Sequence, residues 1–214
     1  MITCFFLHPY DDYILIAGYA SCGYEIFQQC PDIDIVIASC GGGQFLAGIS
    51  SAIKHKKPNC KIYGVEPYGA SNMFQSFKGQ TPVILDKVDT IAKGLATPHT
   101  GRITYDICSR NVDAIILVSD EEIQAALVKC YHTGLAVEPS GCAALAALLY
   151  KKVPGIFSVQ NSGSIPISND YIQYSPFVGK ICGASLRGLS IVVVITGGNI
   201  SPDDLAKIVN SQSG

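Results

Sequence analysis

Charge is scarce in this sequence: only 15% of the 214 residues are charged, and the formal net charge is −2. A protein that neutralises nucleic-acid phosphates or anionic lipid needs a basic surplus, and this chain has none. No apolar run is long enough to span a membrane; the most apolar, residues 191–195, suits a buried strand. The opening residues are too few and too uncharged for a targeting sequence. We therefore expect a cytoplasmic protein with neither nucleic-acid nor membrane partners.

Metal and disulfide frameworks are missing as well. The nine cysteines show no metal-ligand spacing, and no secretory signal precedes them. Reduced, mostly buried thiols are the expected state. Hydrophobic residues make up 48% of the chain, which is typical of a compact protein with a substantial core.

Strand-like and helix-like patterns alternate along the chain, which predicts an α/β fold with a mainly parallel sheet flanked by helices. Strands are expected at residues 2–7, 33–38, 61–65, 114–118 and 191–195, and helices at 13–29, 44–54, 70–77, 120–131, 140–150 and from 201 onward. Residues 155–190 are rich in Ser, Gly, Pro and Asn and have little periodicity. They predict an irregular insert within a single domain of residues 1–214.

The most informative stretch is the glycine run Gly41, Gly42 and Gly43, which follows an apolar strand pattern and opens a helical one. Glycines allow a sharp turn and bring backbone N–H groups close to an oxyanion. A helix start adds unpaired donors and the positive end of the helix dipole. The pattern favours a phosphate site, with a plain strand-to-helix turn as the alternative.

Eight short motifs follow in one order along most of the chain. They are His8-Pro9-Tyr10-Asp11-Asp12, Ile16-Ala17-Gly18, Gly41-Gly42-Gly43, Gly64-Val65-Glu66-Pro67, Asp89-Thr90-Ile91-Ala92, Val118-Ser119-Asp120-Glu121-Glu122-Ile123, Val137-Glu138-Pro139-Ser140 and Thr196-Gly197-Gly198-Asn199. In this order they resemble the pyridoxal-phosphate-dependent serine/threonine dehydratases and serine racemases. The resemblance implies the tryptophan-synthase-β-like fold (fold type II), with the N-terminal part of the family absent.

The resemblance also implies a set of residues that bind pyridoxal 5'-phosphate. Gly41, Gly42 and Gly43 would hold its phosphate together with Gln44, which replaces the usual fourth glycine. The backbone N–H of Gln44 is retained, while its side chain enters a tight turn. Three further positions would lie at the cofactor ring: the Gly94 carbonyl, the Glu138 carboxylate and the Thr196 hydroxyl at the pyridine nitrogen. Glu138 has an alternative role as a carboxylate satisfied at a helix start.

A divalent cation is a second implication of the resemblance. The racemase branch binds Mg²⁺ or Ca²⁺ through a glutamate, a backbone carbonyl and an aspartate, at positions occupied here by Glu66, Ala70 and Asn72. Asn72 supplies an oxygen without a charge, so the affinity should be lower. A solvated carboxylate at the end of a strand is the alternative role of Glu66.

The family's Schiff-base lysine lies in a Phe-Lys-Arg-Gly-like motif upstream of the His-Pro-Phe-Asp-Asp segment, near which this chain begins. The Ser-Ser-Gly-Asn-His segment that grips the substrate is absent too. We therefore assign no catalytic residue: lysines such as Lys54, Lys78, Lys129 and Lys151 read as surface or helix-end residues.

Three functions remain open at this stage. The first is the family reaction, deamination of L-serine or L-threonine to a 2-oxo acid and ammonia. The second is a non-catalytic relative that binds the cofactor weakly, or that pairs with a second copy or a full-length partner. The third is a general nucleotide-binding domain; the seven other motifs, and the missing acidic residue after the glycine run, count against it.

The missing lysine leads to a prediction for the isolated chain. Mixed with pyridoxal phosphate, it should show no stoichiometric absorbance band of a lysine-bound cofactor and form no 2-oxo acid from L-serine or L-threonine, because no activated amine is available. Borohydride reduction followed by mass spectrometry would detect such a bond. Robust turnover would contradict the prediction and require a catalytic lysine elsewhere in the chain.

Overall fold

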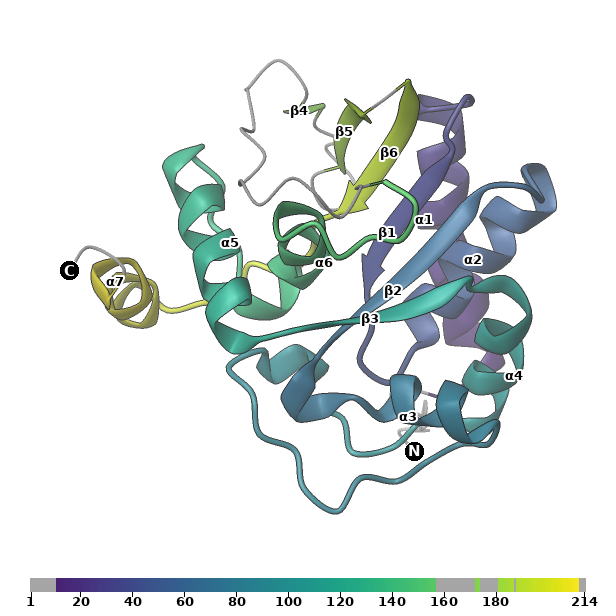
Figure 1. Ribbon diagram of the computed structural model, residues 1–214, viewed down its shortest axis with the longest axis horizontal. Coiled ribbons are helices and arrows are strands. Elements are labelled where there is room, and N and C mark those ends of the chain that lie inside the picture. The colour runs from purple at the N-terminus through teal and green to yellow at the C-terminus, as the bar shows by residue number, and fades with distance from the viewer. Residues whose placement is uncertain (1–10, 157–171, 174–180, 187, 212–214) are drawn as a thin grey trace, which may run out of the picture.

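The computed structural model describes residues 11–156, 172–173, 181–186 and 188–211. Its centre is a sheet with the strand order β3-β2-β1-β6-β5-β4 (Figure 1). The strands are β1 (Ile35–Ser39), β2 (Lys61–Pro67), β3 (Ala114–Val118), β4 (Ile172–Gln173), β5 (Ile181–Leu186) and β6 (Leu189–Val194). The pairs β3–β2, β2–β1 and β1–β6 are parallel, and β5 and β4 join antiparallel at the β6 edge. The predicted fold class, a mainly parallel sheet flanked by helices, is confirmed.

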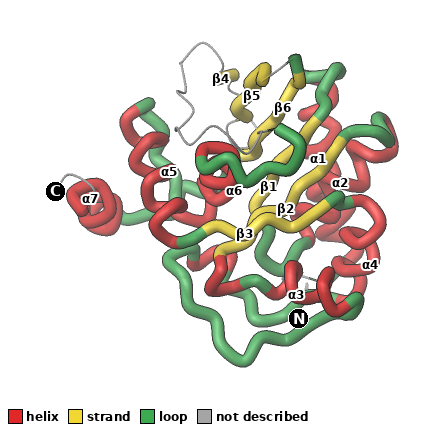
Figure 2. Tube along the Cα trace, viewed as in Figure 1, coloured by secondary structure: helices red, strands yellow, loops and turns green. Residues whose placement is uncertain are grey.

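Helices cover both faces of this sheet (Figure 2). They are α1 (Tyr13–Gln29), α2 (Gln44–Lys56), α3 (Asn72–Gly79), α4 (Arg102–Asn111), α5 (Asp120–His132), α6 (Pro139–Leu149) and α7 (Pro202–Ser211), with short 3-10 turns at Tyr68–Ala70 and Lys93–Leu95. None of the helices in these ranges combines the length and the apolar character that crossing a bilayer requires.

Successive side chains of a strand point to opposite faces of the sheet, and this alternation divides the core into two layers. In β1, Ile35 and Ile37 pack into the layer beneath α5 and α6, whereas Val36 and Ala38 pack into the layer beneath α1 and α2. Successive strand side chains point to opposite faces, so an entirely apolar strand is buried on both sides. Helix α6 is buried from Ser140 to Leu149, and its alanines let it lie close against the central strands.

Several expectations from the sequence agree closely with the structure. Helix α1 and strand β3 have the predicted bounds, and Ser119 and Glu122 form the predicted capping box. Helix α4 was not predicted. In the stretch expected to be irregular, β4, β5 and the start of β6 are strands. Part of that stretch lies outside the described residues, as does the expected strand at 2–7.

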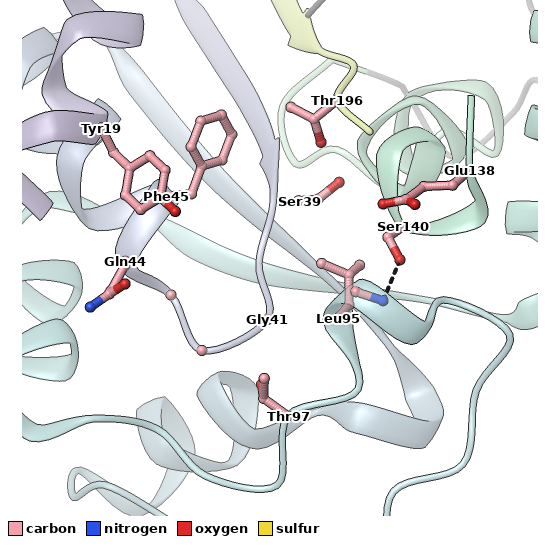
Figure 3. A pocket seen from close by; sticks show the side chains of 13 residues that line it. Tyr19, Ser39, Gly41, Gln44, Phe45, Leu95, Thr97, Glu138, Ser140 and Thr196 are labelled. Carbon is pink, nitrogen blue, oxygen red and sulfur yellow. Dashed lines mark hydrogen bonds between the residues drawn. The ribbon is translucent and has the colours of Figure 1, made fainter. Parts of the chain in front are cut away.

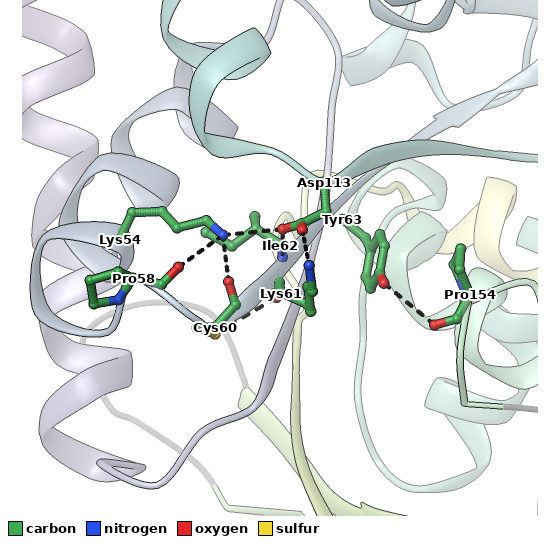
Figure 4. Close-up of polar contacts among 8 residues, drawn as sticks. All are labelled: Lys54, Pro58, Cys60, Lys61, Ile62, Tyr63, Asp113 and Pro154. Atoms are coloured by element: carbon green, nitrogen blue, oxygen red, sulfur yellow. Dashed lines mark hydrogen bonds and ion pairs between the residues drawn. The ribbon is translucent and has the colours of Figure 1, made fainter.

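The starts of β2 and β3 are joined to the end of α2 by a polar cluster around Asp113 (Figure 4). Its carboxylate accepts hydrogen bonds from Lys61 Nζ at 2.6 Å, from the Ile62 N–H at 2.9 Å and from Lys54 Nζ at 3.2 Å. Lys54 also donates to the carbonyl of Cys60 at 2.7 Å. Partial burial alone would raise the pKa of Asp113, but these donors outweigh it and leave the pKa below its ordinary value of 3.8.

Replacing Asp113 should therefore weaken the fold in a pH-dependent way. Asp113→Asn is expected to lower the free energy of unfolding at pH 7 by about 1 kcal/mol, because it removes a partly buried charge with three donors. A carboxyl whose pKa is lowered by folding stabilises the protein above its unfolded pKa, and this contribution is lost as the pH falls through the folded pKa. Urea unfolding over a pH series measures the difference.

Asp89→Asn is the control, because Asp89 and its partner Lys87 are largely exposed at a separation of 3.4 Å. This variant should change stability little. Equal losses in the two variants, or an Asp113 effect that persists into strong acid, would contradict the assignment.

Candidate functional site

A cavity of about 600 Å³ lies at the carboxyl ends of β1 and β6 (Figure 3). The chain leaves β1 through α2 toward β2 on one side, while β6 pairs with β1 on the other. Connections that diverge in this way leave a crevice at the strand ends, where open α/β sheets bind their ligands. The lining residues in the described part of the chain are Tyr19, Ser39, Gly41, Gly42, Gly43, Gln44, Phe45, Gly94, Leu95, Thr97, Glu138, Ser140 and Thr196.

One wall is the glycine loop, residues 41–43, which joins β1 to α2. Gly43 has φ +93°, and a Cβ there would lie 2.5 Å from Met73 Cε and 2.6 Å from Thr104 Cγ2, so only glycine fits. Gly43 is also the N-cap of α2 and has no side chain to accept from the first N–H groups of the helix. No acidic residue lies in that first turn. The wall therefore presents backbone donors and a positive helix end, which suit an anion.

The opposite wall contains Thr196 and Glu138. Its position depends on Gly141, where an added Cβ would lie only 1.4 Å from the Thr196 carbonyl oxygen, so α6 begins directly against the backbone that leaves β6. Glu138 is the N-cap of α6, but its side chain makes no capping hydrogen bond. An added Cβ on Gly197 would lie 2.4 Å from Glu138 Oε1, so the carboxylate lies against the turn that carries Thr196. The geometry therefore does not support the alternative role of Glu138, in which its carboxylate caps the start of α6.

The floor is formed by the 3-10 turn Lys93–Leu95. The N–H of Gly94 donates to Ser140 Oγ at 2.8 Å, which ties this turn to the start of α6. Ser39 Oγ accepts from the N–H of Ala144 at 3.3 Å and joins the same helix to the end of β1. The sequence did not single out Ser39, Ser140 or Thr97 as site residues. Ser140 belongs to the motif Val137-Glu138-Pro139-Ser140, and this was the one signal in the sequence that could have identified it as a site residue.

An aromatic pair closes the remaining side. Tyr19 of α1 and Phe45 of α2 pack edge to face, with ring centroids 5.5 Å apart. Gly48 permits this approach, because a Cβ there would lie 2.7 Å from that of Tyr19. The cavity thus has a backbone-donor wall, a polar wall and an apolar aromatic wall.

The structure brings together every residue that the sequence analysis placed at the cofactor: Gly41, Gly42, Gly43, Gln44, Gly94, Glu138 and Thr196 all line this cavity. Gln44 departs from the expected detail. The tight turn is made by Gly43, and Gln44 is already the first residue of α2. Its side chain is buried and points away from Gly41 (Figure 3).

The three residues predicted for a cation lie beside the glycine loop. Glu66 is fully buried, and its two carboxylate oxygens accept from the N–H groups of Met73 and Phe74, each at 2.8 Å. The side-chain nitrogen of Asn72, not its oxygen, faces the Gly41 carbonyl, at 3.1 Å. Ala70 ends the preceding 3-10 turn. These contacts indicate that Glu66 caps the start of α3. Among the described residues, no group of three or more His, Cys, Asp or Glu is arranged to hold a metal ion. The cation stays a prediction.

The sequence model of the family described as "Pyridoxal-phosphate dependent enzyme" matches residues 2–157 of this chain. The chain belongs to this family. The cavity fits the cofactor that the family name implies, since a helix start without a capping side chain and a neutral hydroxyl line one space together with polar and aromatic groups. No lysine of the described residues lines this cavity.

The relatives that this chain matches are longer than the chain itself. It is 41% identical over 146 residues to the phenylserine dehydratase of Ralstonia pickettii, covering 68% of this chain and 45% of the relative. It is 39% identical over 141 residues to the serine racemase of Schizosaccharomyces pombe, covering 65% and 43%. The chain thus spans less than half the length of these relatives.

Solved structures agree with this family membership. The processed form of threonine deaminase isoform 2 from Solanum lycopersicum superposes with a TM-score of 0.73 at 30% identity, covering 95% of this chain and 51% of that one. Maize serine racemase superposes with a TM-score of 0.74 at 27% identity, covering 96% and 55%. The tryptophan-synthase-β-like fold expected from the motifs is confirmed.

Glu66 gives the site a testable pH dependence. Burial, opposed by its two backbone hydrogen bonds, raises the pKa of its carboxyl from 4.5 to about 8. Between these values the folded protein keeps a proton that the unfolded chain has lost, so the free energy of unfolding should fall as the pH rises through this window. Urea unfolding at a series of pH values measures the slope.

Glu66→Gln should flatten that slope, whereas Glu121→Gln, at an exposed position of α5, should leave it in place. An unchanged slope in the Glu66 variant would show that another group titrates there.

Proposed function

We propose that this chain forms the phosphate-binding part of a pyridoxal-phosphate-dependent dehydratase. The reaction is that of the serine/threonine ammonia-lyases, in which an L-β-hydroxy amino acid gives a 2-oxo acid and ammonia. The single observation that carries the proposal is the cavity at the ends of β1 and β6, where the glycine loop faces the Thr196 hydroxyl. Family membership and the dehydratases among the relatives support it.

Each wall of the cavity has a role in this proposal. The N–H groups of the glycine loop and of Gln44 bind the cofactor phosphate, and the dipole of α2 supports its charge. Thr196 would donate a hydrogen bond to the ring nitrogen, and because a hydroxyl is a very weak acid it would keep its proton, so the nitrogen would stay unprotonated. Glu138 and the Gly94 backbone border the ring, and Tyr19 and Phe45 exclude water from the phosphate side.

When bound, the cofactor supplies the electron sink that stabilises negative charge on the substrate's α-carbon. A ring nitrogen without a proton moderates that sink, which suits elimination of a β-hydroxyl group. The substrate in this proposal is an L-β-hydroxy amino acid. The choice between serine, threonine and the aryl substrate named for the Ralstonia pickettii relative depends on the segments of the family outside this chain.

A non-catalytic role is the second candidate. It is favoured by the cavity lining, in which no described residue is a lysine that could bond to the cofactor aldehyde. In that role the chain binds the cofactor without turnover, or pairs with a second copy or a full-length partner. Formation of a 2-oxo acid separates the two candidates.

The phosphate loop can be tested directly by charge. Gly42→Asp places a carboxylate among the loop N–H groups and should weaken binding of pyridoxal 5'-phosphate to the chain by at least about tenfold, because like charges meet at short range. Phosphorus-31 NMR titration measures the affinity, and thermal unfolding confirms that the variant folds.

Gly18→Asp is the matched control. It adds the same charge on α1, where an added Cβ would meet nothing within 4 Å, and should leave the affinity within about twofold. Equal affinity of the native chain and the folded Gly42 variant would remove the loop from the phosphate site.

A further inference from the structure

The Gly41 carbonyl is held by a buried polar network at the start of α3. Asn72, the first residue of α3, donates from Nδ2 to this carbonyl oxygen at 3.1 Å and to Thr100 Oγ1 at 3.1 Å. A backbone carbonyl only accepts, so the amide nitrogen must face Gly41, and the orientation of the side chain is determined. A carboxylate at this position could not donate.

The opposite side of the same peptide carries the donor. The peptides of the described residues are trans, and in a trans peptide the C=O and the following N–H point in opposite directions. Holding the Gly41 carbonyl toward Asn72 therefore directs the Gly42 N–H away from Asn72, and Gly42 is one of the residues that line the cavity. The other anchored carbonyl of the loop belongs to Gly43, which accepts from the N–H of Ala47 as the first hydrogen bond of α2.

Asn72 is itself held firmly. The carboxylate of Glu66 caps the next two residues of α3 at 2.8 Å each, and Ser76 Oγ donates to the Asn72 carbonyl at 2.7 Å. Within the described part of the chain, the buried Oδ1 of Asn72 has no hydrogen-bond partner. A residue that only filled space would not carry this cost, so the donor end of the amide is what the position requires.

We propose that Asn72 is the positioning residue of the phosphate site: its amide fixes the Gly41–Gly42 peptide so that the Gly42 N–H faces the anion. This inference rests on the proposed function for the identity of the anion. The orientation of the peptide is independent of it.

The test compares Asn72→Leu with Ser76→Ala. Leucine keeps the branched shape and the number of side-chain heavy atoms of asparagine, although it is larger, and removes both N–H donors. Alanine at position 76 breaks the same buried network, at Thr100 Oγ1 (3.0 Å) and at the Asn72 backbone carbonyl (2.7 Å), but it keeps the Asn72 amide that donates to Gly41. Titration with inorganic phosphate should show affinity weakened by at least about tenfold in Asn72→Leu and changed by less than about twofold in Ser76→Ala. Both variants are expected to lose stability, which urea unfolding measures.

A spectroscopic readout follows the peptide itself. Glycine–glycine bonds occur only between Gly41 and Gly42, Gly42 and Gly43, and Gly197 and Gly198. A chain labelled with carbonyl-¹³C glycine and ¹⁵N glycine therefore gives amide-to-carbonyl correlations for these three bonds alone. Asn72→Leu should shift the Gly41 carbonyl and Gly42 amide signals and leave the Gly197–Gly198 signal unchanged, whereas Ser76→Ala should leave all three near their native positions.

The outcomes separate the two proposals. If the native chain binds no phosphate, the proposed function fails, and unshifted Gly41 and Gly42 signals in Asn72→Leu would overturn the positioning role independently. If the native chain binds phosphate and a folded Asn72→Leu variant binds it equally well, the positioning role is overturned and the phosphate site stands.

Discussion

The turn from β1 into α2 is the constraint on which the site depends. The strand must become a helix within four residues, Cys40 to Gly43, at the point where the neighbours of β1 diverge. Gly43 makes this possible with a left-handed conformation in a space too small for a Cβ. The same turn leaves the N-terminal donors of α2 without a capping side chain, so the geometry that completes the fold also supplies the donors of the proposed phosphate site.

Close backbone approach recurs around the cavity. Helix α6 starts against the Thr196 carbonyl because residue 141 is glycine, and this contact places Thr196 and Glu138 on one wall. Behind the opposite wall, the Asn72 amide holds the Gly41 carbonyl. Rigid elements therefore fix both sides of the site, which is what preorganised binding of a cofactor requires.

Local signals in the sequence predicted much of the fold. The β-branched residues of β3, the capping box before α5 and the proline at the start of α6 each indicate structure through nearest neighbours, and each was found in place. Helix α4 was missed because its first turn is capped from a distance: Asp11 accepts from the N–H groups of Arg102 and Thr104, some ninety positions along the chain. No local pattern contains that contact.

The sequence alone determined the family, the glycine loop and seven of the residues that line the cavity, because motifs record backbone requirements at single positions. It did not single out the others, such as Ser39, Thr97 and Ser140. Only the tertiary structure decided how the loop is held. It showed Glu66 capping α3 with both oxygens, where the motif suggested a cation, and it turned the nitrogen of Asn72 toward Gly41. The partners of a buried polar group come from segments that meet only on folding, and which of its atoms is used follows from their geometry.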